Sequence, residues 1–165
     1  MRGQNQTPPL ADATPFRFAV IVSRFNETVT GSLRDAATAA LAEAGAAGVQ
    51  VLSVPGAFEI PQAARAAAET GRFDAIVCLG CIIRGETPHF DYLASAVAHG
   101  ITAAAGDTGI PMAFGVLTTD TVEQAAARSG PGPDNKGREA AAAAIEMAAL
   151  YRSLSGSSRP FGFRV

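Results

Sequence analysis

Four short apolar segments, each followed by a segment with helical periodicity, set the main constraint on how this chain can fold. The apolar segments are rich in β-branched and aromatic residues, as buried strands are, and they cover residues 16–22, 49–55, 74–83 and 111–117. Helical spacing of apolar residues predicts helices over residues 28–44, 59–70, 88–105, 121–130 and 137–154. Strands that are apolar throughout and alternate with helices are typical of a parallel sheet covered on both faces. The sequence therefore predicts an α/β protein, a three-layer sandwich around a four-stranded parallel sheet.

The length and composition indicate one domain with neither a membrane nor a nucleic acid as partner. A chain of 165 residues is most simply one domain, which we place at residues 16–154, between a disordered polar lead (1–15) and a loose tail (155–165). Thirteen basic and fifteen acidic side chains give a formal net charge of −2, with no basic cluster for a nucleic acid. The longest apolar run is far shorter than the roughly 18 residues of a spanning helix, and the lead lacks the apolar core of a secretory signal. We therefore expect a cytoplasmic protein.

Cys78 and Cys81 form a CxxC motif of the kind found in redox and zinc sites. Both lie in the predicted strand 74–83, where a separation of three residues points their side chains to opposite faces. A zinc site also needs about four ligands, and the sequence contains no second CxxC and no HxxxH. We therefore predict two packed, reduced thiols and no metal.

Polar and aromatic residues gather at the carboxyl ends of the predicted strands. These ends carry SRFNET (23–28), PGAFEIP (55–61), CIIRGETPHF (81–90) and LTTD (117–120). Ligands of open α/β sheets bind beyond the carboxyl ends of the strands. We therefore expect the functional site at this edge.

The segment IRGETPHF, residues 83–90, has the features of a phosphate-binding helix start. Thr87 is a suitable N-cap and Pro88 suits the first helical position, so unpaired N–H groups would face the sheet edge. Gly85 would allow close approach and Arg84 is nearby, and the positive end of the helix dipole favours an anion. An ordinary strand-to-helix turn explains the same residues.

His89 lies in the first turn of this helix and is a candidate general acid or base. Asp91, two residues later, faces elsewhere on the helix. The sequence contains no GxSxG motif, so a Ser-His-Asp triad has little support. A capped or half-buried structural histidine is the alternative.

Phe25 and Phe58 belong to RFN and GAFE, which follow the first and second predicted strands. A pair of aromatic rings beside Asn26 and Glu59 would hold a flat heterocycle and bind its polar edges and a hydroxylated chain. Rings tucked into the core are the alternative. Their shared location at the sheet edge favours a ligand.

The segment DNKGREA, residues 134–140, begins the last predicted helix with Asn135 as its cap. Lys136 is a cation at the positive end of the helix dipole, which is slightly unfavourable for stability and indicates a role toward a ligand. A solvated loop lysine is the alternative. Arg128 ends the preceding helix, where the dipole favours a cation in any case.

Together, these segments resemble the 6,7-dimethyl-8-ribityllumazine synthase family of riboflavin biosynthesis. The resemblance covers about residues 16–152, through SRFN, VPGAFEIP, GCIIRGETPHFDY, GVLTTDTVEQAAARSG and NKGREAAAAAIEMA, in the family's order and spacing. It implies a flavodoxin-like sheet and a transferase-type condensing enzyme of the penultimate step. The family joins 5-amino-6-(D-ribitylamino)uracil to 3,4-dihydroxy-2-butanone 4-phosphate and releases phosphate and water. The substrate amine is the nucleophile, so the resemblance implies no enzyme nucleophile, metal or cofactor.

The resemblance also implies roles for residues of the matching motifs. The pyrimidine and its ribityl chain would be held by Phe25, Asn26, Ala57, Phe58 and Glu59, with the backbone of Ile82 and Ile83. The phosphate would be bound by Gly85, Glu86, Thr87 and Arg128. His89 would carry protons during imine formation and phosphate elimination, and Glu139 would orient it. Phe114, Lys136 and Arg128 would come from a neighbouring subunit, because the family's sites lie between the subunits of a pentamer.

One loop departs from the family pattern. Capsid-forming members have a Gly/Lys-rich loop before the NKG motif, whereas this chain reads SGPGPDNKG (129–137), with two prolines and no lysine before Lys136. The short spacing from Arg128 to Lys136 is nevertheless the one associated with capsids. We expect a homopentamer, with a sixty-subunit icosahedral shell left open.

Two other kinds of protein with the same fold class fit this sequence less well. A flavodoxin needs a Gly- and hydroxyl-rich loop after the first strand, and a receiver domain needs an Asp at the end of the third strand; neither is present. A lumazine- or flavin-binding relative without catalysis and a purely structural shell protein stay open as alternatives.

Overall fold

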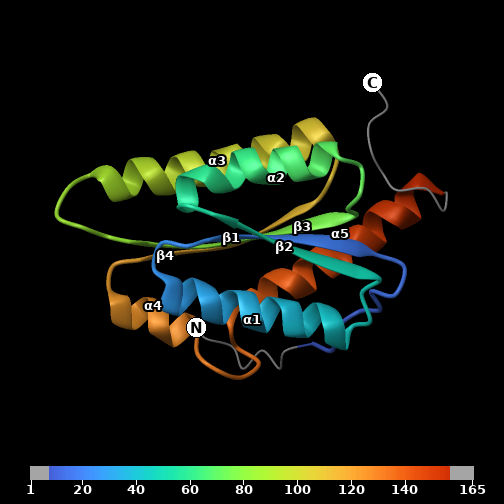
Figure 1. Cartoon of the computed structure of the whole chain (residues 1–165), viewed down its shortest axis with the longest axis horizontal. Coiled ribbons are helices and arrows are strands. Elements are labelled where there is room, and N and C mark those ends of the chain that lie inside the picture. Colours follow the sequence, from blue (N-terminus) through green and yellow to red (C-terminus); the bar gives the residue numbers. More distant parts are fainter. Residues whose placement is uncertain (1–7, 157–165) are drawn as a thin grey trace.

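The computed structural model describes residues 8–156 of the chain, which form three layers (Figure 1). The middle layer is a parallel sheet with the strand order β2-β1-β3-β4. Its strands are β1 (Arg17–Ser23), β2 (Gly48–Val54), β3 (Ala75–Ile83) and β4 (Met112–Thr119). The helices are α1 (Glu27–Glu43), α2 (Ile60–Glu69), α3 (His89–Thr108), α4 (Val122–Arg128) and α5 (Lys136–Ser155), and the 3-10 turn η1 (Ala57–Glu59) precedes α2. The predicted three-layer fold with a flavodoxin-like parallel sheet is confirmed.

Each face of the sheet has its own hydrophobic core. Helices α1, α4 and α5 cover one face, and α2 and α3 cover the other (Figure 1). Along β1, Val20 and Val22 belong to the core beneath α1 and α5. Ala19 and Ile21 belong to the core beneath α2 and α3. Because side chains alternate between the faces of a strand, a sheet with two cores requires strands that are apolar throughout.

The central strand β3 is almost completely buried and carries both cysteines. Cys78 packs in the core beneath α2 and α3, and Cys81 in the core beneath α1 and α5, so the predicted opposite orientation is confirmed. Both are buried free thiols. Burial raises the pKa of Cys78 to about 12 and that of Cys81 to about 11, which keeps both thiols protonated near neutral pH.

The edge strand β2 departs from the expectation of strands covered on both faces. Val49 and Val51 are 39% and 42% exposed. Within the described chain β2 pairs with β1 alone, so one side of its backbone has no neighbouring strand. The apolar composition of β2 therefore predicts that the segment is a strand, but it does not predict how deeply the side chains are buried.

The helices agree with the predicted segments apart from small differences at their ends, with one clear error in α3. Gly106 was expected to end this helix, but α3 continues to Thr108 and ends at Gly109, which has a φ of 69°. The Gly109 N–H donates to the Ala105 carbonyl at 2.9 Å. A glycine inside a helix costs only about 1 kcal/mol, whereas a left-handed C-terminal residue strongly favours glycine, so the helix ends at the second one.

Part of the lead that was expected to be disordered packs against the folded chain. Ala13 is fully buried, and its N–H donates to the Ala44 carbonyl at 2.9 Å. Leu10 and Ala11 pack against the core beneath α1 and α5. The polar composition of residues 1–15 gave no sign of this contact, because only a few apolar residues form it. Residues 1–7 and 157–165, which include most of the expected tail, lie outside the described part.

Helices α1 and α5 are in close contact where α5 begins. A Cβ atom on Gly137 would overlap the Leu33 carbonyl oxygen and lie 2.7 Å from the carbonyl carbon. Only glycine therefore allows α5 to begin directly against the α1 backbone. Among residues 8–156, none of the helices combines the length and the apolar character required to cross a membrane.

Candidate active site

A cavity of about 650 Å³ opens beyond the carboxyl ends of β1, β2 and β3. Its walls are formed by Phe25, Asn26, Gly56, Ala57, Phe58, Glu59, Cys81, Ile82, Ile83, Gly85, Thr87, His89, Phe90 and Leu93. Sequence reasoning missed four of these residues as site residues, namely Gly56, Cys81, Phe90 and Leu93. A usable signal existed for Leu93, which follows His89 by one helical turn and so shares its side of α3. We call this space the large cavity.

Asn26 holds the turn between β1 and α1 in a conformation that exposes Phe25. Its φ of 61° and ψ of 50° are left-handed, and it is the one described residue other than glycine with a positive φ. Asparagine tolerates this conformation better than most residues, and such backbone strain is common at functional sites. The Asn26 side chain does not cap α1 but donates from Nδ2 to the Cys81 carbonyl at 3.0 Å. Phe25 is left 71% exposed at the cavity.

Phe58 and Glu59 are presented by the short turn η1. A Glu59 carboxylate oxygen accepts from the Gly56 N–H at 3.0 Å, and the Glu59 N–H donates to the Gly56 carbonyl at 3.3 Å. This reciprocal pair fixes the carboxylate at the wall of the cavity. Phe58 is 60% exposed. Large rings left outside both cores at two strand ends form an apolar surface suited to a flat ligand.

The loop between β3 and α3 leaves its backbone donors open. Within the described chain, the N–H groups of Gly85, Glu86 and Thr87 donate no hydrogen bond, and all three residues are exposed. A Cβ on Gly85 would meet no atom within 4 Å. Because α3 begins directly after this loop, the positive end of its dipole lies at the same place. We call residues 85–88 the phosphate loop, after the role predicted for it.

Helix α3 begins at His89, and Thr87 is not its cap, contrary to expectation. The N-cap position is Pro88, and no side chain bonds the first turn. Pro88 has a φ of −68° and a ψ of 1°, so the chain turns toward helical geometry one residue after Thr87 and beyond the reach of its hydroxyl. Thr87 and His89 both line the large cavity, and neither side chain makes a hydrogen bond to another part of residues 8–156.

Arg84 is close to the phosphate loop, but its guanidinium is engaged elsewhere. Its Nε donates to Asp120 at 2.8 Å, and one Nη donates to both carboxylate oxygens of Asp91 at 3.3 Å. The hydrogen bond to Asp120, followed by that to Asp91, raises the pKa of the Arg84 guanidinium. In this structure the guanidinium is directed to two carboxylates, and a contribution of Arg84 to the phosphate cradle stays a prediction. Among residues 8–156, no Lys or Arg lines the large cavity.

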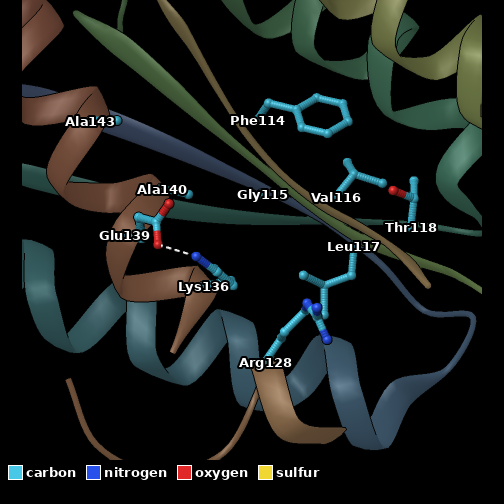
Figure 2. Close-up of a pocket in the computed structure, with 10 residues that line it drawn as sticks. All are labelled: Phe114, Gly115, Val116, Leu117, Thr118, Arg128, Lys136, Glu139, Ala140 and Ala143. Atoms are coloured by element: carbon cyan, nitrogen blue, oxygen red, sulfur yellow. Dashed lines mark hydrogen bonds and ion pairs between the residues drawn. The ribbon is translucent and has the colours of Figure 1, made fainter. Parts of the chain in front are cut away.

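A second, shallower cavity of about 290 Å³ lies between β4, α4 and α5 (Figure 2). Its lining includes four more of the predicted residues, Phe114, Arg128, Lys136 and Glu139. Lys136 Nζ lies 2.5 Å from a Glu139 carboxylate oxygen. Arg128 donates to the Gln124 carbonyl of its own helix at 2.9 Å. Phe114 is 48% exposed on β4. We call this space the shallow cavity.

In a single chain the predicted site residues lie in two separate cavities, apart from Glu86, which lines neither of them. The large and the shallow cavity have no described residue in common. Within the described chain Glu139 makes its side-chain hydrogen bond to Lys136 and none to His89, the residue that it was expected to orient. Sequence reasoning assigned Phe114, Arg128 and Lys136 to a neighbouring subunit, and Glu139 lies with them.

Comparison with known proteins finds one family that matches nearly the whole chain. The family model described as 6,7-dimethyl-8-ribityllumazine synthase matches residues 15–152. A protein of that name from Syntrophus aciditrophicus is 51% identical over 144 residues, which are 86% of this chain and 94% of the relative. Another protein of that name, from Salinibacter ruber, is 54% identical over 142 residues, or 85% of this chain and 91% of the relative.

Proposed function

Because the chain belongs to the 6,7-dimethyl-8-ribityllumazine synthase family, we propose that it condenses 5-amino-6-(D-ribitylamino)uracil with 3,4-dihydroxy-2-butanone 4-phosphate. The protein is then a cytoplasmic, transferase-type enzyme of riboflavin biosynthesis. The observation that carries the proposal is the large cavity, whose walls combine two exposed aromatic rings, the open start of α3 and a histidine. A flat heterocycle and a phosphate can occupy these two parts together.

The apolar end of the large cavity suits the pyrimidine and its ribityl chain. Phe25 supplies a ring for stacking, and Phe58 is a second aromatic ring in the same wall. The amide nitrogen of Asn26 donates to the Cys81 backbone carbonyl, so the amide oxygen is left to accept from the heterocycle. The Glu59 carboxylate accepts from ring N–H or ribityl hydroxyl groups. Ala57 and the backbone of Ile82 and Ile83 complete this part of the site.

The polar end suits the phosphorylated ketone. The N–H groups of Gly85, Glu86 and Thr87 and the α3 dipole bind the phosphate. His89 begins the same helix, beside the position of the carbonyl. The amine of the pyrimidine adds to that carbonyl, and water leaves to form an imine. His89 then takes and returns protons as the phosphate departs, which requires a group that can act as both acid and base.

The charge of the phosphate requires basic groups that the large cavity lacks in one chain. Arg128 and Lys136 lie in the shallow cavity with Glu139 and Phe114. We therefore place the complete site between two copies of the chain, one supplying each cavity, in a homopentamer. In that arrangement Arg128 neutralises the phosphate, Lys136 and Phe114 contact the substrates, and Glu139 orients His89 across the interface.

The first test is direct turnover. Purified protein is mixed with both substrates, and lumazine absorbance is followed against the slow uncatalysed reaction. We expect acceleration proportional to enzyme, and His89→Ala should slow kcat by about 100-fold because general acid-base catalysis contributes on that order. The KM for the pyrimidine should stay unchanged. A wild-type rate equal to the uncatalysed rate, with pyrimidine binding intact, would instead identify a lumazine- or flavin-binding protein.

A second test addresses the shared site. His89→Ala alters the large cavity and Arg128→Ala the shallow one, so each variant alone is impaired. If both are co-expressed and assemble at random, roughly a quarter of the interfaces combine two intact halves and regain activity. Co-expression of His89→Ala with Phe58→Ala, both in the large cavity, is the matched control and should recover nothing. Equal recovery in both mixtures, or none in either, would contradict a site between chains.

A further inference from the structure

Arg84 joins three parts of the fold around the phosphate loop. Its N–H donates to the Thr119 carbonyl at 2.9 Å, which fixes the end of β3 to the end of β4. Its guanidinium reaches Asp120 in the turn after β4 and Asp91 in the first turn of α3. We call Arg84, Asp91 and Asp120 the arginine clamp. It connects two turns that are far apart in the sequence.

The arginine clamp holds both ends of the phosphate loop. Arg84 is itself the residue before the loop, and Asp91 lies just beyond the residue at which α3 begins. Within the described chain the loop N–H groups have no bonds of their own to fix their direction. Their direction therefore depends on how the two ends are held.

The same guanidinium also fixes the turn that carries His89. The Arg84 Cζ lies 4.3 Å from the centre of the Phe90 ring, within cation–π distance. Phe90 lines the large cavity and packs against the core beneath α2 and α3. Because Phe90 follows His89 directly, restraint of the ring also restrains the backbone that places the imidazole.

The charges indicate that Arg84 does not bind the phosphate itself. One guanidinium is shared between two carboxylates, and its side chain is not part of the cavity wall. On the basis of the proposed function, we propose that Arg84 is a positioning residue. Through Asp91, Asp120 and the Phe90 ring, it orients the phosphate loop and the first turn of α3 for the phosphorylated substrate.

The test begins with Arg84→Met, which keeps most of the apolar stem and removes the charge. We expect the KM for the butanone phosphate to rise about tenfold and kcat to fall by a similar factor, because small misplacements of binding and catalytic groups are costly. The KM for the pyrimidine should change less than about twofold. Arg84→Lys keeps a cation over the ring but reaches only one carboxylate well, so it should restore part of the loss.

Arg65→Met is the matched control. Arg65 also bridges two carboxylates, Glu69 at 3.0 Å and Asp107 at 2.9 Å, with a side chain 49% exposed compared with 43% for Arg84. Exposed ion pairs contribute little to global stability, so both variants should unfold near the wild-type temperature. Only Arg84→Met should alter the KM for the phosphorylated substrate. A similar effect of Arg65→Met, or an equal rise in both KM values of Arg84→Met, would overturn the inference.

Asp120→Asn distinguishes positioning from direct phosphate binding. If Arg84 acts through Asp120, this variant should impair the phosphorylated substrate in the same direction. The double variant Arg84→Met/Asp120→Asn should then be no worse than Arg84→Met alone, because the two residues act as one unit. If Arg84 bound phosphate directly, Asp120→Asn would free the guanidinium and strengthen binding, which would refute a positioning role.

Hydrogen exchange tests the clamp independently of catalysis. The Asp91 and Tyr92 N–H groups donate to the Pro88 carbonyl at 3.1 and 3.5 Å, so their exchange reports fraying of the α3 start. In Arg84→Met, exchange should be about tenfold faster at these amides and unchanged in α5. Unchanged exchange at Asp91 and Tyr92 would overturn the inference. If the wild type lacked turnover, the proposed function would fail, but this measurement would still decide the role of Arg84.

Discussion

Helices α3 and α5 begin in opposite ways, although each follows a polar loop near one of the two cavities. At α5, the Asn135 side chain accepts from the Gly137 N–H at 2.8 Å and donates to the Gly130 carbonyl at 2.9 Å. Asn135 is only 3% exposed. At α3, the N-cap position is Pro88, no side chain caps the first turn, and the loop before it is exposed.

The contrast separates a helix start that serves the fold from one that is open to a ligand. The first N–H groups of a helix lack partners within the helix and need them elsewhere. The protein supplies a side-chain cap at α5, whereas at α3 the donors before the helix are left to solvent or a ligand. Substitutions at the α5 start should therefore affect stability, and those at the α3 start should affect binding.

The largest expected effect comes from Gly137→Ala, which disrupts the capped start of α5, called here the closed helix start. The added Cβ would overlap the Leu33 carbonyl, and backbone cannot move aside as a flexible side chain can. We expect a loss of about 3 kcal/mol or more in the free energy of unfolding, or failure to fold. The thermal midpoint at fixed protein concentration should fall by roughly 6–12 °C.

Gly106→Ala is the control for this prediction. Gly106 is an exposed position inside α3, and a Cβ there meets no atom within 4 Å. Alanine should raise stability by about 0.5–1 kcal/mol, because glycine is unfavourable within a helix. A midpoint for Gly137→Ala equal to that of the wild type would show that α1 and α5 are not in close contact at this position.

The next effect in size compares the two candidate caps. Asn135→Ala removes the side-chain cap of α5 and the bond to Gly130, so it should cost about 1–2 kcal/mol in denaturant unfolding. Thr87→Ala should change stability by less than about 0.5 kcal/mol, because Thr87 caps nothing. If both variants lost equal stability, the distinction between a closed and an open helix start would fail.

Much of the fold followed from sequence because the local signals and the packing agree. Gly45 was predicted to stop α1, and its φ of 82° shows the left-handed conformation expected at a helix end. Gly106 carries the same signal, but α3 continues past it and ends at Gly109, about one turn later. Which of two glycines ends a helix depends on tertiary packing, which periodicity does not report.

The candidate site was predictable in location but not in its connections. The strand-end rule placed Phe25 and Phe58 at one edge, and both line the large cavity. The partners of Arg84 were not predictable, because Asp120 lies 36 residues away and meets it only through the pairing of β3 with β4. The sequence motif therefore placed Arg84 beside the predicted phosphate site but gave no sign of its two carboxylate partners.

The smallest expected stability effect is at Lys136, the first residue of α5. This helix is capped by Asn135. The Lys136 side chain is nevertheless 42% exposed in the shallow cavity. A cation there opposes the helix dipole by about 0.3–1 kcal/mol, and its exposed pair with Glu139 returns a similar amount. Lys136→Met should therefore change stability by less than about 0.5 kcal/mol while lowering turnover.

Arg138→Met is the informative comparison for Lys136→Met, because it removes a basic side chain only two residues later. Arg138 is 21% exposed and binds Glu43 of α1 at 2.8 and 3.2 Å, so it links two helices. Its removal should lower the thermal midpoint clearly more than that of Lys136 and should affect turnover less. If Lys136→Met were as destabilising as Arg138→Met, Lys136 would belong to the closed helix start and would have no separate role toward a ligand.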